Sequence, residues 1–314
     1  MSAQIRSGAQ TLLPAGFLLG HAEDNAAATG CSVILCEAGA VGGVAVRGGA
    51  PATRETDLLD PANSVQAIHA VVLCGGSAFG LAAAGGVAEY LAGRRVGFEL
   101  GGHHVPIVCA AALFDLTCGD GSRLPDAPMG IAACNAARPE VAMDAVGAVG
   151  AGRGATVGKL LGPELSMPGG FGAASVTVDT LVVSAVVAVN ACGSVFDPAD
   201  NRPVAGVRNP RMPEQLLSRD ELLEHLTAVA VGHQPPSNTT IGCLMTNACL
   251  SKPQVHRVAS MAHDALARTI APAHMSMDGD TLFAMACGDV PASPDLIGYL
   301  GTCALEAAIL DAVS

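Results

Sequence analysis

The chain has 314 residues, long enough for one large domain or two ordinary ones, and 50% of them are hydrophobic while 14% are charged. Its formal net charge of −12 argues against nucleic acids and anionic membranes as partners, because the few basic residues form no patch. With 38 Gly but only 7 Phe and 2 Tyr, the core must be built from Ala, Val and Leu, whose small side chains permit closely packed layers.

Short apolar runs alternate with helical patterns in the first two thirds of the chain. The pattern predicts strands at 31–36, 67–73, 105–108, 173–178 and 181–189. It predicts helices at 81–91 and 127–137, the second capped by Asp126. A Gly-rich segment occupies 147–158, and the stretch 198–213, rich in Pro, Arg and Asn, is typical of a surface loop.

The last third has a clear strand-helix-strand-helix pattern. A helix at 219–231, capped by Ser218, precedes a Pro-rich linker at 232–238. Strands are then predicted at 239–246 and 281–286, and helices after Ser251 and from Ser293 to about Val313. The helix after Ser251 places one apolar face at 3.6-residue spacing, formed by Val255, Val258, Ala259, Ala262, Leu266 and Ile270. We therefore predict a single α/β domain, 1–314, with helices packed outside sheets.

Composition also bears on location and cofactors. The longest apolar run, 181–189, is about half of the ~20 residues that a membrane-spanning helix needs. No small-residue cleavage site follows the apolar patch at 12–19, so we expect no signal peptide and a cytoplasmic location. The 11 Cys form no CxxC motif, and His103-His104 has no neighbouring ligand at metal-site spacing. Reduced thiols are therefore expected, with no metal and no cofactor.

Two Gly-rich segments are candidates for binding sites. In Cys74-Gly75-Gly76-Ser77-Ala78-Phe79-Gly80 the Phe breaks the pattern of a nucleophile elbow, so Ser77 is expected to cap the next helix. Its glycine N–H groups could converge on a carbonyl oxygen or a carboxylate. The segment 150–159 is not a phosphate-binding P-loop, because Leu follows Lys159 where Ser or Thr is required. Lys159 is either a solvated surface residue or a cation held by the Gly-rich turn.

Polar residues at strand ends give further candidates, each with two interpretations. Asn190 could donate to an oxyanion, or it could cap a turn. Asp278 and Asp280 could share a cleft and hold an ammonium group, or they could form a solvated acidic turn. A calcium loop is not expected there, because the further acidic ligands are missing.

The peptide bond between Asn238 and Thr239 joins the Pro-rich linker to an apolar strand. A Thr hydroxyl is a weak nucleophile, but a Thr at a new chain start has its own α-amine, of pKa about 7.7–8, as a base. The bond could therefore be where a hydrolase cleaves itself, or it could simply end a turn.

Taken in order, segments spread over nearly the whole chain resemble the L-aminopeptidase D-amidase/D-esterase family, which includes β-peptidyl aminopeptidases and nylon-oligomer hydrolases. The segments are Gly20-His21-Ala22, Arg47-Gly48-Gly49-Ala50-Pro51, Arg54-Glu55-Thr56-Asp57, Gly75-Gly76-Ser77-Ala78-Phe79-Gly80, Val105-Pro106-Ile107-Val108, Gly154-Ala155-Thr156-Val157-Gly158-Lys159, Ala188-Val189-Asn190, Asn238-Thr239-Thr240 and Met277-Asp278-Gly279-Asp280-Thr281.

The resemblance implies a four-layer αββα sandwich that cleaves itself between Asn238 and Thr239 into an α fragment, 1–238, and a β fragment, 239–314. It places the nucleophile on Thr239. The residues that it implies as support are Lys159, Asn190, Asp278 and Asp280. A Thr with an Asp-Gly-Asp pair is closer to the nylon-oligomer hydrolases. Cys74 and Arg153 depart from the family pattern, which leaves side-chain selectivity open.

The implied activity is hydrolysis of amides through an acyl-enzyme. Expected substrates are small peptides, amino acid amides or amino acid oligomers with a free amino end, such as 6-aminohexanoate oligomers. Either Lys159 or the Thr239 amine would be the base. The resemblance also implies a homo-oligomer, a tetramer of αβ units. Two alternatives stay open: an acyltransferase of the ornithine acetyltransferase type, and an unprocessed, non-catalytic binding protein.

Overall fold

The computed structural model describes residues 3–229 and 238–314 of the chain. Residues 232–237 of the expected linker lie outside this description. Among the described residues, no helix is long and apolar enough to cross a bilayer. The apolar run 181–189 is a strand instead.

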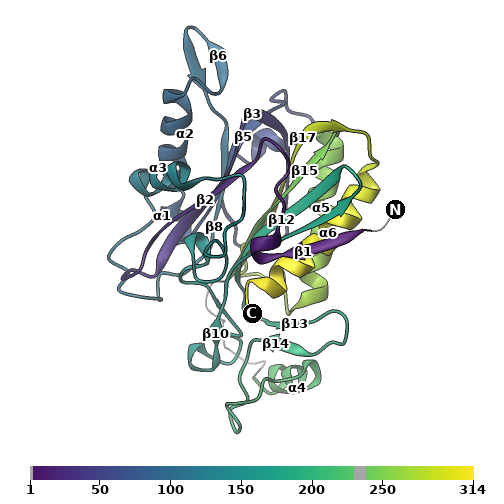
Figure 1. Cartoon of the computed structure of the whole chain (residues 1–314). Coiled ribbons are helices and arrows are strands. Elements are labelled where there is room, and N and C mark those ends of the chain that lie inside the picture. Colours follow the sequence, from purple (N-terminus) through teal and green to yellow (C-terminus); the bar gives the residue numbers. More distant parts are fainter. Residues whose placement is uncertain (1–2, 230–237) are drawn as a thin grey trace.

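Ten strands are joined by hydrogen bonds into one continuous sheet that folds into two layers. The long strand β3 (Thr29–Val46) belongs to both layers and passes from one to the other (Figure 1). The layer that we call the β15 sheet contains, beside the second half of β3, β17 (Thr281–Val290), β15 (Thr239–Ala248), β12 (Leu181–Asn190), β11 (Gly170–Val178) and β1 (Gln4–Ser7). The layer that we call the β5 sheet contains, beside the first half of β3, β2 (Leu18–Asp24), β5 (Ile68–Cys74), β8 (Val108–Ala112) and β4 (Ala52–Arg54). The register of β3 shifts between Leu35 and Ala40, where it passes from one layer to the other.

Helices cover the outer faces of both sheets (Figure 1). The β15 sheet carries α5 (Lys252–Thr269) and α6 (Pro294–Asp311), and the β5 sheet carries α2 (Ala83–Gly93) and α3 (Ala127–Ala136). Two further helices are α1 (Ser77–Gly80) and α4 (Arg219–Val229). The short strands are β6 (Phe98–Leu100), β7 (His103–Val105), β9 (Thr156–Val157), β10 (Met167–Pro168), β13 (Ser194–Phe196), β14 (Pro203–Ala205) and β16 (Ile270–Ala271).

Three buried apolar clusters separate the four layers. Along β12, Val183, Ala185 and Val187 face the helices of their own layer, whereas Val186 and Ala188 face the β5 sheet. This alternation follows from the two-residue period of a strand, and it explains why β12 is apolar on both faces. A third cluster lies between the β5 sheet and its two helices. The predicted αββα sandwich is thereby confirmed.

Several predicted elements are confirmed with their local causes. Asp126 caps α3, where its Oδ1 accepts a hydrogen bond from the Met129 N–H at 2.9 Å. Ser251 and Gln254 form a capping box at the start of α5, and the predicted apolar face of that helix is buried. Ser293 caps α6 through the Leu296 N–H at 3.2 Å.

Other predictions need correction. The strand expected at 105–108 divides into the end of β7 and the start of β8, because Pro106 has no N–H to donate to a ladder. The stretch 198–213 is not all surface loop, since β14 lies within it and Ala205 and Val207 are buried. The first half of the fold contains strands that were not predicted, among them β2, the second half of β3 and the β6–β7 hairpin.

The α2–α3 contact offers a test of this packing. A Cβ on Gly86 would collide with the carbonyl oxygen of Ala127, whereas a Cβ on Gly93 of the same helix would meet no atom within 4 Å. We predict that Gly86→Ala lowers the free energy of unfolding by about 1–3 kcal/mol or more. Gly93→Ala should leave it unchanged or raise it by up to about 1 kcal/mol. Urea denaturation of both variants measures this, and equal stabilities would contradict the packing.

Candidate active site

Thr239 is the first residue of β15 and stands opposite Asn190, the last residue of β12, in their antiparallel register. Directly opposed residues of antiparallel strands project their side chains to the same face of a sheet, with Cβ atoms about 5 Å apart. Both residues are buried. The sheet therefore brings together two polar strand ends that are far apart in the sequence.

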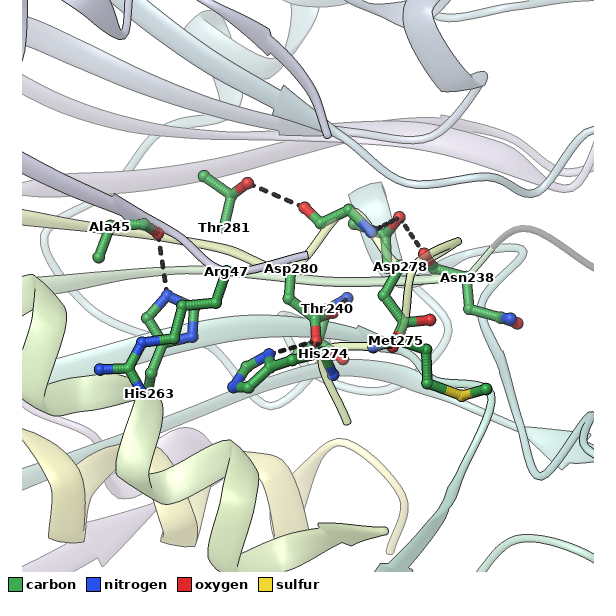
Figure 2. Close-up of polar contacts among 12 residues, drawn as sticks. Ala45, Arg47, Asn238, Thr240, His263, His274, Met275, Asp278, Asp280 and Thr281 are labelled. Carbon is green, nitrogen blue, oxygen red and sulfur yellow. Dashed lines mark hydrogen bonds and ion pairs between the residues drawn. The ribbon is translucent and has the colours of Figure 1, made fainter. Parts of the chain in front are cut away.

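The Thr239 hydroxyl lies against the peptide bond that precedes it. Its Oγ1 donates a hydrogen bond of 2.5 Å to the carbonyl oxygen of Asn238. The Gly279 N–H donates to the same carbonyl oxygen at 3.0 Å and to Thr239 Oγ1 at 3.2 Å. Figure 2 shows Asn238 beside Asp278, its partner in an isolated β-bridge. A backbone N–H on a carbonyl oxygen can stabilise negative charge that develops there.

Gly279 itself was not predicted as a functional residue. A Cβ at this position would lie 2.8 Å from Thr239 Oγ1 and 3.1 Å from the carbonyl oxygen of Ala50. A glycine therefore allows the backbone N–H to approach the hydroxyl so closely. The signal in the sequence was its place between two aspartates, which drew attention to their side chains instead.

The Asp280 carboxylate is held by neighbouring groups of the protein. Its Oδ1 accepts a hydrogen bond from the Thr240 N–H at 2.7 Å. Its Oδ2 accepts from the His274 N–H at 3.1 Å and from His274 Nδ1 at 2.8 Å. In the continuous chain, Asp280 thus binds the residue after Thr239, and the histidine that supports it was not predicted.

Asp278 has a different environment although it lies only two residues away. Its Oδ2 accepts a hydrogen bond from the Met275 N–H at 2.7 Å. Its Oδ1 is buried and has no hydrogen-bond partner among the described residues. Burial, and next the negative charge of Asp280, raise the pKa of Asp278 to about 6, against the lowering effects of the Met275 N–H, His274 and Lys159.

Lys159 is buried, so of its two interpretations the solvated surface lysine is wrong. It follows the Gly-rich turn and the short strand β9. Its Nζ donates to Asn190 Oδ1 at 2.7 Å and to the Asn190 carbonyl oxygen at 3.3 Å. Burial lowers the pKa of Lys159 to about 8, and nearby acidic groups, Asp278 among them, limit the fall. A lysine with such a pKa can release its proton near neutral pH.

Asn190 connects Lys159 to the face of the sheet that carries Thr239. Its Oδ1 also accepts a hydrogen bond from the Thr156 N–H at 3.0 Å, and its Nδ2 donates to the Phe114 carbonyl oxygen at 2.8 Å. A carboxamide nitrogen carries two hydrogens, so Nδ2 can donate one further bond.

The Gly75-Gly76 turn is occupied by the protein's own carboxylate. The Gly76 N–H donates to Asp115 Oδ1 at 2.7 Å, and Thr29 Oγ1 donates to Asp115 Oδ2 at 2.7 Å. The expected role of Ser77 as a helix cap is wrong, because the N-cap position of α1 is Gly76 and Ser77 itself starts the helix at a φ of 53°. The turn is therefore a structural element of the β5 sheet.

The pair His103 and His104, for which no metal site is expected from the sequence, lies away from this site. Both residues belong to the β6–β7 hairpin, which projects from the β5 sheet (Figure 1). Within residues 3–229 and 238–314, no group of three or more His, Cys, Asp or Glu side chains could hold a metal ion.

Known proteins resemble this chain over most of its length. The model of peptidase family S58 matches residues 13–313. An uncharacterized aminopeptidase of Mycobacterium tuberculosis is 46% identical over 275 residues, which cover 85% of this chain and 76% of the relative. A 6-aminohexanoate-oligomer endohydrolase of Kocuria sp. is 30% identical over 284 residues, which cover 89% of this chain and 76% of the relative.

Solved structures share the fold at low sequence identity. A β-aminopeptidase of Burkholderia sp. superposes with a TM-score of 0.67 at 20% identity, covering 95% of this chain and 84% of the other. The L-aminopeptidase D-Ala-esterase/amidase of Ochrobactrum anthropi, described as a variant of the Ntn-hydrolase fold, gives 0.66 at 16% identity with the same coverage.

The raised pKa of Asp278 predicts a pH-dependent stability. Since its pKa in the folded chain, about 6, exceeds the ordinary value of 3.8, the native state holds this proton more tightly, and the resulting stability is lost as pH rises from about 4 to 6. The test uses a Thr239→Ala parent, in which the chain stays continuous. The free energy of unfolding of the Asp278→Asn variant, minus that of this parent, should increase by up to about 3 kcal/mol as pH rises from 4 to 7, because asparagine has no proton to lose. Urea denaturation across this range measures the gain, and a difference that does not vary with pH would contradict the assignment.

Proposed function

This chain belongs to peptidase family S58 and is a hydrolase acting on amide bonds, and we propose that it becomes active by cleaving its own peptide bond between Asn238 and Thr239. The observation that carries this proposal is the joint contact of the Thr239 hydroxyl and the Gly279 N–H with the carbonyl oxygen of Asn238. A hydroxyl group and a backbone N–H donor thus meet at one peptide bond, which supports the proposal.

In the precursor, Thr239 Oγ1 attacks the carbonyl carbon of Asn238, and the Gly279 N–H stabilises the resulting oxyanion. One such donor contributes about 3–4 kcal/mol to comparable reactions. We propose that Lys159, which binds the Asn190 side chain opposite Thr239, takes the hydroxyl proton. Collapse of the intermediate breaks the bond between the Asn238 carbonyl carbon and the Thr239 nitrogen, which takes the proton back from Lys159, while the acyl group stays on Thr239 Oγ1. Water then hydrolyses this ester. The products are a carboxylate on Asn238 and a free amine on Thr239.

In the mature enzyme, the same hydroxyl attacks the amide of a substrate. The Thr239 amine or Lys159 removes the hydroxyl proton, and the second hydrogen of Asn190 Nδ2 donates to the oxyanion. The acyl-enzyme releases an amine and is then hydrolysed by water. We assign the Asp278 carboxylate, whose Oδ1 has no hydrogen-bond partner among the described residues, to hold the new ammonium group of Thr239. Asp280 orients the chain through the Thr240 N–H.

For substrates we propose small peptides, amino acid amides or amino acid oligomers with a free amino end. Two relatives bear names of this kind, aminopeptidase and 6-aminohexanoate-oligomer endohydrolase. The net charge of −12 supports this choice, because an acidic protein attracts a substrate that carries an ammonium group.

We further propose that the chain forms a homo-oligomer, a tetramer of αβ units. Apolar side chains on the β6–β7 hairpin support this assembly: Phe98 and Val105 are 41% and 45% exposed, and Leu100 is 75% exposed. Exposed apolar groups clustered on one hairpin are typical of a surface that another chain covers.

Removal of the hydroxyl tests self-cleavage. Wild type should give two polypeptides that separate before Thr239 in intact-mass measurements under denaturing conditions, and Thr239→Ala should give one polypeptide and no amide hydrolysis. Thr239→Ser keeps a hydroxyl and should still be cleaved. The control is Thr240→Val at the next, also buried, position. Valine has nearly the shape of threonine and keeps the backbone N–H that Asp280 binds, so this variant should be cleaved as wild type.

Two results would redirect the proposal. A processed Thr239→Ala chain would exclude this nucleophile, and an uncleaved wild type would favour the non-catalytic binding protein. Hydrolysis of an aminoacyl anilide, measured with and without an acceptor amine, separates a hydrolase from an acyltransferase.

The chain's two lysines provide a matched pair for testing the base. Lys159→Met should lower the rate of self-cleavage by about 100-fold or more, since it removes a general base. In wild type the rate should rise with pH up to about 8, as Lys159 loses its proton. Lys252 is also buried but binds the carbonyl oxygens of Leu58 and Asn63. Lys252→Met should therefore lower stability and leave cleavage intact; equal cleavage in both variants would exclude Lys159 as the base.

A further inference from the structure

His274 holds the Asp280 carboxylate with two donors at once. Its backbone N–H and its ring Nδ1 both donate to Asp280 Oδ2, at 3.1 and 2.8 Å. The φ of His274 is +60°, in the left-handed region that residues other than glycine adopt infrequently. Such a conformation persists only where the surrounding contacts hold it, and it is commonest at functional sites.

The ring of His274 packs against a residue of α5. His263 of that helix is fully buried, and its Nε2 bonds to the Ala45 carbonyl oxygen at 2.9 Å. The two imidazole rings meet edge to face with centroids 4.9 Å apart. Figure 2 shows His274 between His263 and the Asp280 carboxylate. The rotation of the His274 ring is therefore limited by a helix that is itself anchored to β3.

The other oxygen of Asp280 reaches the strand of the nucleophile. Asp280 Oδ1 accepts the Thr240 N–H at 2.7 Å, and the Asp280 carbonyl oxygen accepts the Arg47 N–H at 3.0 Å. A continuous set of contacts thus connects α5, through His263, His274 and Asp280, to the residue that follows Thr239.

We propose that His274 is a positioning residue for the nucleophile, because it fixes the Asp280 carboxylate that aligns the start of β15. The inference rests on the proposed function. When the ring donor is lost, the buried carboxylate can rotate away from the Thr240 N–H, and Thr239 Oγ1 no longer stays against the carbonyl group that it attacks. Displacements of this size slow a reaction even though the displaced groups do not react.

Two substitutions at position 274 separate the hydrogen bond from the backbone strain. Glycine and asparagine both tolerate a positive φ, but only asparagine keeps a side-chain donor. We expect His274→Gly to slow self-cleavage and lower kcat by about 10-fold or more, with KM within about 2-fold of wild type. His274→Asn should restore both rates to within about 3-fold. Cleavage is followed by intact mass, and turnover by release of an aminoacyl anilide.

Controls keep the test decisive. Asp179→Gly, in the exposed turn between β11 and β12 and also at a positive φ of 52°, should change neither rate. If thermal unfolding shows that His274→Gly does not fold, His274→Ala replaces it, since the chain already holds Ala28 at a φ of 50°. If His274→Gly is cleaved and turns over substrate at wild-type rates, this inference is wrong while the proposed function stands. The same holds if the Gly and Asn variants lose equal amounts of cleavage rate and kcat. A wild-type chain that stays uncleaved and inactive would overturn the proposed function with it.

Discussion

The pairing of β12 with β15 is the constraint on which the site depends. It sets Asn190 opposite Thr239 at one end of the sheet, and Asn190 in turn binds the buried Lys159. A shift of one residue would turn Thr239 to the other face of the sheet and separate it from both groups. The register is fixed because both faces of these strands are buried, one by α5 and α6 and the other by the β5 sheet.

The Asp278-Gly279-Asp280 turn adds three different functions within three residues. Gly279 brings a backbone N–H to the Asn238 carbonyl oxygen, Asp280 secures the chain through Thr240, and Asp278 keeps a buried oxygen unpaired among the described residues. Two carboxylates in one turn thus differ because their surroundings differ. The Asp280 carboxylate, which accepts three hydrogen bonds, suits positioning. The Asp278 carboxylate, with its raised pKa and an oxygen that has no partner among the described residues, suits the ammonium group that the proposed cleavage would create.

Sequence patterns predicted the regular parts of this fold, and the family resemblance supplied most of the candidate site residues. The buried face of α5 recurs at 3.6-residue spacing, and strands β11 and β12 are near-continuous apolar runs, so the places of these elements were evident. Strand β3 was only half predicted, because its second half is rich in Gly and Ala, which carry little pattern. The αββα layering came from the family resemblance rather than from periodicity.

For the site, the candidate side chains could be listed from the sequence, but their burial and hydrogen-bond partners could not be predicted from it. Spacing alone left Lys159 as either a surface cation or a buried one, and only its burial decided the matter. The Gly279 N–H has no side-chain signature at all. The support of Asp280 by His274 uses a left-handed backbone at position 274 and a ring contact with His263 of α5, and no sequence pattern signals either.

N-terminal sequencing of the purified wild-type protein tests most directly whether the fold creates its own nucleophile. If the geometry at β15 works as described, the smaller polypeptide begins Thr239-Thr240-Ile241-Gly242, and fully active protein contains no chain continuous through residue 238. Active protein in which every chain remains continuous there, or a smaller fragment that begins at another residue, would contradict this mechanism.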